Sequence, residues 1–172
     1  MNRKLLILYV MFVSYSLISM VSNRTVSLDF LALFQLQGDP LLVMVFNMLG
    51  VFPIYYVFVL STYEKQKSYI YILFGLGFML GAFAIIPGIL LLKGKQKSLK
   101  PFQEKMFIIL PILLLLMGII GIIFGNISDY FQLFLTDQFV HIMTIDFVVL
   151  LMTPYLLGAK GFPYVHLTKW HV

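Results

Sequence analysis

The stretch 75-GLGFMLGAFAIIPG-88 determines how many times this chain can cross a membrane. It lies within an apolar run, residues 69–92, whose length suits one transmembrane helix, since such a helix needs about 20 residues. Its three glycines before Pro87 and the glycine after it can also break a helix within the membrane, provided that protein buries the bend. We expect one kinked, glycine-rich span here, and a re-entrant segment remains the alternative.

The composition of the chain indicates a membrane protein. Of its 172 residues, 61% are hydrophobic and only 11% are charged, whereas soluble domains carry roughly 25% charged residues. The length suits a single domain, residues 1–172. The absence of cysteine excludes disulfides and thiol catalysis. The net charge of +5 fits loops that face anionic lipid, and no lysine or arginine cluster forms a nucleic-acid-binding module, so we expect no nucleic-acid partner.

Five segments are long and apolar enough to span a bilayer. These predicted spans are residues 5–21, 41–60, 69–92, 106–125 and 139–157. Their apolar runs are continuous and do not alternate, which favours helices over barrel strands. The fold class is therefore an all-α, polytopic transmembrane helical bundle of about five membrane helices. Because no clean cleavage site follows the first span, we expect it to be an uncleaved helix and not a signal peptide.

A short apolar segment precedes the second span. Residues 27–37 are too few to cross a membrane and end at the turn formed by Gly38, Asp39 and Pro40. We predict a short interfacial or re-entrant helix in this segment.

The charges of the loops conflict with five simple crossings. Basic residues lie at the N-terminus, in loops 61–68 and 93–105, and in the C-terminal tail, whereas acidic residues dominate the two other loops. The positive-inside rule places all four basic segments in the cytoplasm. Five crossings cannot do this, because loops 61–68 and 93–105 flank a single predicted span. Either some of the basic residues face the outside, or residues 69–92 do not cross the membrane.

Two polar residues lie near the centres of predicted spans. Asp146 is close to the centre of the last span, where a charge costs about 2.5–3.5 kcal/mol on insertion scales. We therefore expect it to face the bundle interior and to be protonated or paired. Asn47 is the corresponding residue of the second span. A hydrogen bond from its amide to the carboxylate would satisfy both groups and lock two helices together.

His141 and Thr144 complete the candidate site. Residues five apart are about 140° apart around a helix, so His141 and Asp146 do not share a face, whereas His141 and Thr144 do. A proton path from His141 to Asp146 is the functional alternative to a purely structural pair. We assign Asn47, Asp146, His141 and Thr144 to an intramembrane polar site. We predict no metal site, no cofactor and no catalytic residues, since the sequence contains no phosphate-loop, hydrolase or metalloprotease motif.

Two segments carry a resemblance to a known family. The sequences 46-FNMLGVFPIYY-56 and 141-HIMTIDFVVLLMTPYLL-157, with the Gly-Ala-Phe-Ala run at residues 81–84, resemble a family of small multi-pass membrane proteins of photosynthetic and other bacteria and of plastids. The family has no established activity. The resemblance implies one recurring core that includes Asn47, Gly50, Pro53, His141, Asp146 and Pro154.

Three functional interpretations follow for a multi-pass protein of the cell membrane. The first is a protein that binds or transports a small solute, ion or lipid at the polar site. The second is a non-catalytic accessory or assembly protein that holds a partner membrane protein, or a second copy of itself, through its glycine-rich faces. The third, an enzyme with His141 or Asp146 as general base, has the least support, because no catalytic motif accompanies these residues.

Overall fold

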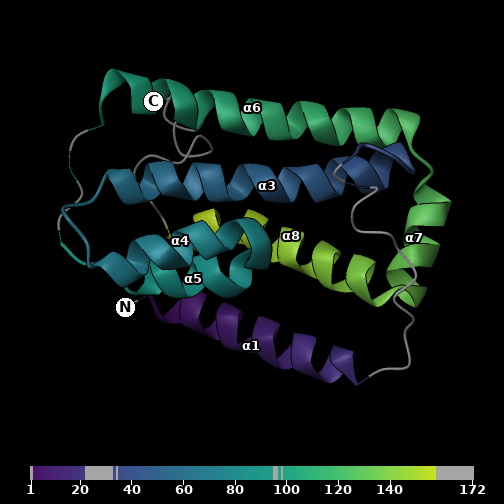
Figure 1. The fold of residues 1–172 in the computed structure, drawn as a ribbon, viewed down its shortest axis with the longest axis horizontal. Helices are drawn as coiled ribbons and strands as arrows, with labels where there is room; N and C mark the ends of the chain where they lie inside the picture. Colours follow the sequence, from purple (N-terminus) through teal and green to yellow (C-terminus); the bar gives the residue numbers. More distant parts are fainter. Residues whose placement is uncertain (1, 22–32, 34, 95–96, 98, 158–172) are drawn as a thin grey trace, which may run out of the picture.

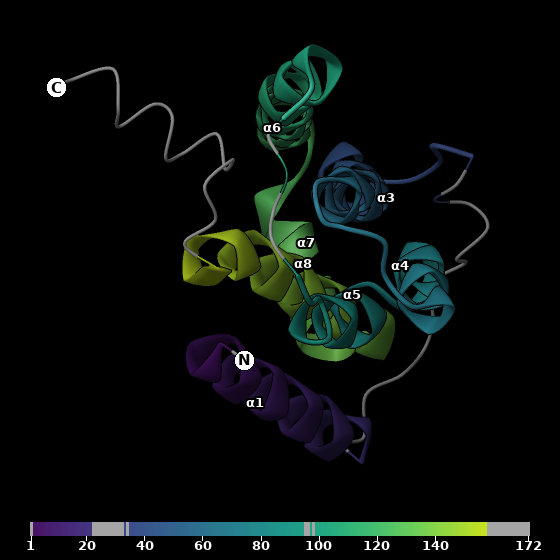
Figure 2. The ribbon, with the colours of Figure 1, turned by 90° about the vertical axis from the view of Figure 1, so that its left-hand side faces the viewer.

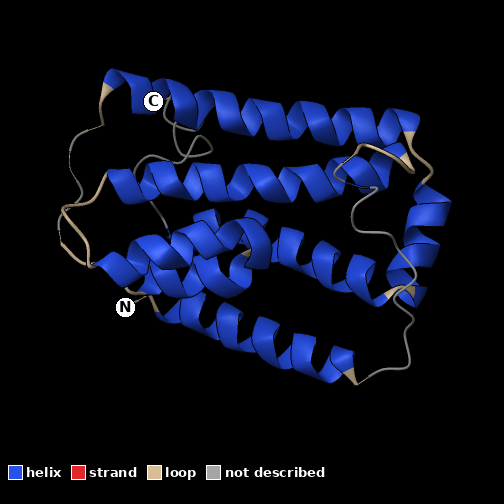
Figure 3. Cartoon of the chain, viewed as in Figure 1, coloured by secondary structure: helices blue, strands red, loops and turns tan. Residues whose placement is uncertain are grey.

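The computed structural model describes residues 2–21, 33, 35–94, 97 and 99–157. Seven helices form within these residues. Figure 3 distinguishes the helices from the loops and turns that connect them. They are α1 (Arg3–Met20), α3 (Pro40–Ser61), α4 (Ser68–Leu80), α5 (Ala82–Leu90), α6 (Pro101–Phe124), α7 (Ile127–Thr136) and α8 (Gln138–Leu157). The helix predicted over residues 27–37 lies mostly outside the described residues.

Four of the described helices, α1, α3, α6 and α8, are long and apolar enough to cross a membrane. They agree, within a few residues, with the first, second, fourth and fifth predicted spans. Along the chain, each of these four helices runs antiparallel to the one before it (Figure 1). The Asn2 side chain, before α1, donates a hydrogen bond to Leu156 O near the end of α8 (2.7 Å), and Gln103 at the start of α6 donates to Ser61 Oγ at the end of α3 (2.8 Å).

The segment predicted as the third span is not one continuous helix. Residues 69–92 form two helices, α4 and α5, which meet at Gly81 with φ 53° and ψ −129°. At 1.5 Å per residue, these helices are about 20 Å and 14 Å long, too short to cross a hydrocarbon core of about 30 Å. The positive φ at Gly81 is a conformation that glycine adopts at no steric cost.

α5 folds back along α4, so the pair forms a helical hairpin (Figure 1). A β-carbon added at Gly88 would lie 2.7 Å from Phe74, and one added at Gly77 would lie 2.6 Å from Ile85. In a continuous helix, residues 14 apart would be separated by about 21 Å. The glycines thus allow the close approach of the two arms, as small residues do in membrane helix pairs.

The two ends of the hairpin are joined by hydrogen bonds. Gln66 donates from Nε2 to Lys93 O (2.7 Å) and accepts at Oε1 from Lys93 N (3.1 Å). Lys97 N donates to Thr62 O (2.7 Å). The loops before and after the hairpin therefore lie at the same end of the bundle, which removes the charge conflict.

We call this end of the bundle the basic end. It also includes the start of α1, the end of α3, the start of α6 and the end of α8 (Figure 1). Here basic residues outnumber Glu64 and Glu104. The described basic residues at this end are Arg3, Lys4, Lys65, Lys67, Lys93, Lys97, Lys100 and Lys105.

The opposite end, which we call the acidic end, contains Asp39, Asp129 and Asp137. Asp39 caps α3 through Oδ1, which accepts from Leu41 N (2.9 Å), while its Oδ2 accepts from Asn126 N (2.7 Å). This carboxylate thus ties the start of α3 to the turn between α6 and α7. α7 then crosses the acidic end and packs on α8 and α3 (Figure 1).

The core lies between α1, α3, α8 and the hairpin. Tyr56, Phe74, Ile85 and Leu150 are among its fully buried side chains. α6 stands at the edge and packs mainly on α3 (Figure 2). This arrangement places the hairpin tip beside the centre of α8.

Candidate functional site

Asp146 caps the second arm of the hairpin. Its Oδ1 accepts a hydrogen bond from Ala82 N, the first residue of α5, at 2.7 Å, and the residue is only 6% exposed. The first N–H groups of a helix have no partner within the helix and carry a partial positive charge. A carboxylate near the middle of an apolar helix is therefore explained by its bond to the N-terminus of a second, shorter helix.

The hairpin tip fits closely against this carboxylate. A β-carbon added at Gly81 would overlap the carboxyl atoms of Asp146. α1 supports the tip from another side, since Tyr9 Oη donates to Phe83 O at 3.3 Å and the Phe12 and Phe83 rings are in contact. Asp146 is within about 2 Å, along the axis, of the centre of α8. The tip consequently reaches the middle of the bundle.

Asn47 has a different partner from the predicted one. Its Nδ2 donates to Val43 O on its own helix at 2.8 Å, whereas Asp146 binds Ala82 on the hairpin. The structure thus does not pair Asn47 with Asp146. The backbone N–H at the start of α5 takes the place expected for the Asn47 amide.

His141 joins three helices at the acidic end. Its Nδ1 is 2.9 Å from Phe134 O of α7, and its Nε2 is 2.6 Å from Tyr15 Oη of α1. A carbonyl can only accept, so Nδ1 carries the proton, and in the neutral ring Nε2 accepts from Tyr15. The ring is 2% exposed and stacks on Phe134. Both nitrogens are therefore satisfied by α1 and α7, away from the hairpin.

Thr144 also fastens α7 to α8. Its hydroxyl donates to Val140 O (2.7 Å) and lies 2.7 Å from Tyr130 Oη. Burial raises the pKa of Tyr130 above its usual value, and the hydrogen bond to Thr144 opposes this in part. Because the Thr144 hydroxyl hydrogen is used in the bond to Val140 O, Tyr130 Oη is the donor to Thr144 Oγ1. His141 and Thr144 both contact α7, in agreement with the shared face predicted from helical spacing.

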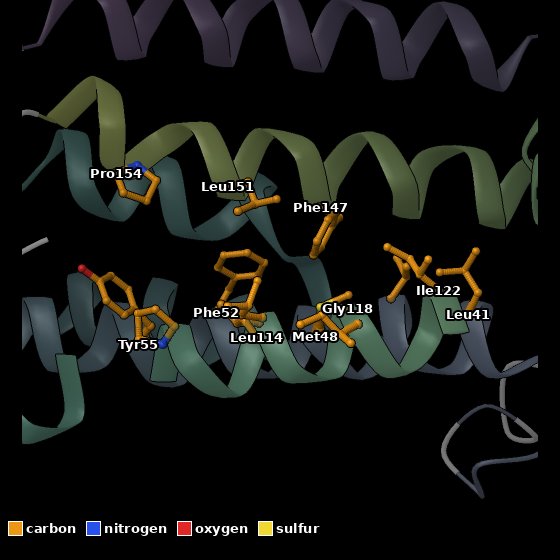
Figure 4. A pocket seen from close by; sticks show the side chains of 14 residues that line it. Leu41, Met48, Phe52, Tyr55, Leu114, Gly118, Ile122, Phe147, Leu151 and Pro154 are labelled. Atoms are coloured by element: carbon orange, nitrogen blue, oxygen red, sulfur yellow. The ribbon is translucent and has the colours of Figure 1, made fainter. Parts of the chain in front are cut away.

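An apolar groove lies elsewhere in the bundle, and the sequence did not predict it. It has a volume of about 390 Å³ and runs between α3, α6 and α8 (Figure 4). None of the described residues that line it is charged. The lining includes Leu41, Met48, Phe52 and Tyr55 of α3, Pro111, Leu114, Gly118 and Ile122 of α6, and Phe147, Leu151 and Pro154 of α8.

The groove is long and follows the helices. Its lining on α3 extends from Leu41 to Tyr55, a rise of about 21 Å. Its lining on α6 repeats at intervals of three and four residues, so one face of α6 forms a wall. The volume falls within the range of about 300–1,000 Å³ typical of ligand pockets. This shape suits a linear, apolar ligand that lies parallel to the helices.

The four candidate polar residues therefore occupy three places and not one site. Asp146 binds the hairpin tip, His141 and Thr144 belong to the joint between α7 and α8, and Asn47 bonds within α3. Within the described residues, no group of three or more His, Asp or Glu side chains is placed to hold a metal ion.

Neither a protein-family model, nor a curated protein, nor a solved structure matches this chain. The family resemblance of the segments at 46–56 and 141–157 thus stays a prediction.

Proposed function

We propose that this chain is an integral protein of the cell membrane with four crossings and one re-entrant hairpin, and that its basic end faces the cytoplasm. The support is the number of long apolar helices together with the position of the hairpin, which brings loops 61–68 and 93–100 to one end. With this arrangement the positive-inside rule is obeyed by every described loop.

Single cysteines test this topology, because the natural chain has none. In intact cells, a membrane-impermeant maleimide is expected to label Ser128→Cys at the acidic end. Lys67→Cys and Lys97→Cys should react only after the membrane is permeabilised. The cysteine-free parent chain is the control for background labelling. Labelling of positions 67 and 97 from opposite sides of the membrane would show that residues 69–92 cross it, contrary to the hairpin.

We further propose that the protein binds the hydrocarbon chain of a membrane lipid in the groove between α3, α6 and α8. The observation that carries this proposal is the long groove without a charged residue in its lining. Ions and polar solutes would lose their hydration there without gaining partners. Asp146, the polar group that first suggested a solute site, is instead occupied by the N-terminus of α5.

The groove holds a chain by packing and not by hydrophobic burial. Lipid tails are as apolar as leucine side chains, so moving a chain from the bilayer into the groove yields no hydrophobic gain. The favourable free energy comes instead from close van der Waals contact with the ordered side chains that line the groove. Phe52 and Phe147, whose rings contact each other, are two of these side chains. A bound lipid should therefore survive extraction into mild detergent, where competing bilayer lipid is dilute.

Gly118→Trp is expected to displace the lipid. Gly118 lines the groove, and a β-carbon added there meets no atom within 4 Å, so the indole would enter the groove. Gly75→Trp is the matched control, because Gly75 also has open space around it but lies on α4, outside the groove. Native mass spectrometry after extraction should show at least a fivefold lower lipid-bound fraction for Gly118→Trp, and no change for Gly75→Trp. Equal lipid occupancy in the two variants, or none in the natural protein, would refute lipid binding in the groove.

A further inference from the structure

Residues 126–138, predicted as a loop between two spans, contain a ten-residue amphipathic helix, α7. Asn126 caps it, since its Oδ1 accepts from Ser128 N (3.0 Å) and Asp129 N (3.3 Å). One side of α7 faces the protein. Tyr130, Leu133 and Phe134 pack on the cluster formed with α3 and α8.

A second side of α7 is apolar and exposed. Ile127 and Phe131 are each 59% exposed, and Leu135 is 51% exposed. Their spacing of four residues places them in one stripe along the helix. At 100° per residue this stripe lies beside the half-buried side of α7 that faces the protein, so the two together form a continuous apolar arc of roughly 200°.

The third side of α7 is polar. Ser128, Asp129, Gln132 and Thr136 are all exposed, and their positions fill the arc that the apolar residues leave. A helix in water would have no reason to expose the stripe that contains Phe131. The apolar arc of α7 is thus wider than the part that packs on the protein, and a polar arc lies opposite it. This pattern is typical of helices that lie in a membrane interface.

The position of α7 fits the same interpretation. It connects the end of α6 to the start of α8, two helices apolar enough to cross a membrane. The turn before it is bound to the start of α3 through Asp39. α7 therefore lies at the level where three spanning helices end, and it runs across them (Figure 1). This is the level of the lipid headgroups in that leaflet.

We propose that α7 is an interfacial helix that inserts Ile127, Phe131 and Leu135 into the boundary between the headgroups and acyl chains of the leaflet at the acidic end. Ser128, Asp129 and Gln132 then face water. α7 contains no lysine or arginine, so it binds the leaflet through apolar area and needs no anionic lipid. His141 and Thr144 fasten α7 to α8. The contact between α7 and the leaflet therefore also sets the depth of the whole bundle in the membrane.

Adjacent positions of α7 provide the test. Ile127→Cys, Ser128→Cys, Phe131→Cys and Gln132→Cys, made one at a time, are labelled with an environment-sensitive fluorophore in phosphatidylcholine vesicles. Lipids with a quencher near the headgroup should quench the labels at 127 and 131 at least threefold more than those at 128 and 132. The emission at 127 and 131 should also be shifted to the blue. The same result is expected when anionic lipid is added, because no cation on α7 attracts it.

Two results would overturn the proposal. If all four labels report water and none is quenched, α7 lies outside the membrane. If the labels at 127 and 131 are blue-shifted but not quenched by the labelled lipid, protein and not lipid covers this side of α7. Leu116→Cys on the exposed side of α6 separates these outcomes from a failure of membrane insertion, since a lipid quencher deep in the bilayer should reach it wherever α7 lies.

Discussion

Gly81→Ala is expected to lower the free energy of unfolding by about 2–6 kcal/mol. At φ 53° and ψ −129°, Gly81 has a backbone conformation that costs other residues about 1–3 kcal/mol. The added methyl group would also overlap the Asp146 carboxyl group. The carboxylate must then move from Ala82 N, and a buried N–H without a partner costs a further 1–3 kcal/mol or so.

The measurement is the unfolding of the purified protein in mixed micelles with increasing fractions of denaturing detergent. Gly75→Ala is the control, since Gly75 lies within α4 and a β-carbon there meets no atom within 4 Å. Alanine favours a helix over glycine by up to about 1 kcal/mol, so this control should be unchanged or slightly stabilised. If both variants unfold like the natural protein, the tight turn at Gly81 beside Asp146 is incorrect.

The hairpin shows which part of this fold the sequence can and cannot predict. The helices α1, α3, α6 and α8 follow from composition alone, because a bilayer requires long apolar runs with satisfied backbones. The run at 69–92 meets the same criterion and yet turns back at Gly81. Contacts between the two arms accompany this turn, namely the approach of Phe74 to Gly88 and of Ile85 to Gly77.

One sequence signal did favour the hairpin. The lysines of loops 61–68 and 93–105 could all lie on one side of a membrane only if residues 69–92 did not cross. The length of the run favours one crossing and the charge pattern favours none, and the two short helices of the structure agree with the charge pattern. α7 also has a sequence signal, because Asn126 precedes a segment with apolar residues spaced three and four apart.

For the candidate site, local patterns were predictable and tertiary partners were not. Helical spacing placed His141 and Thr144 on one face, and both contact α7. Asp146 was expected to face the interior, and it does. Its partner is a backbone N–H, however, which every residue except proline carries, so no side chain in the sequence identifies it. The groove is formed by three helices together and has no signal in any one of them.

Asp146→Ala and Asp146→Asn are expected to differ strongly, and the difference separates the hydrogen bond from the charge. In the alanine variant, Ala82 N loses its acceptor in the middle of the bundle. An unpaired polar group in a membrane-embedded core costs several kcal/mol, because no water replaces the partner. We therefore expect Asp146→Ala to lower the free energy of unfolding by about 2–4 kcal/mol.

The asparagine variant keeps an oxygen at the position of Oδ1, so the bond from Ala82 N can form. It loses the attraction between a carboxylate and the positive end of α5, worth about 0.3–1 kcal/mol at most exposed sites and up to about 2 kcal/mol at partly buried ones. It also avoids the cost of placing a charge near the membrane centre. These two effects oppose each other, so we expect the stability of Asp146→Asn to lie within about 1 kcal/mol of the natural protein.

Detergent unfolding of both variants, beside the natural protein, measures this difference. A stable asparagine variant with an unstable alanine variant means that Asp146 serves to bind the hairpin, and that its charge is dispensable for the fold. If Asp146→Asn is as unstable as Asp146→Ala, the negative charge itself holds α5 through its helix dipole. If neither variant is destabilised, the bond between Asp146 and Ala82 does not hold the hairpin, and the contacts of α1 with Phe83 must hold the tip instead.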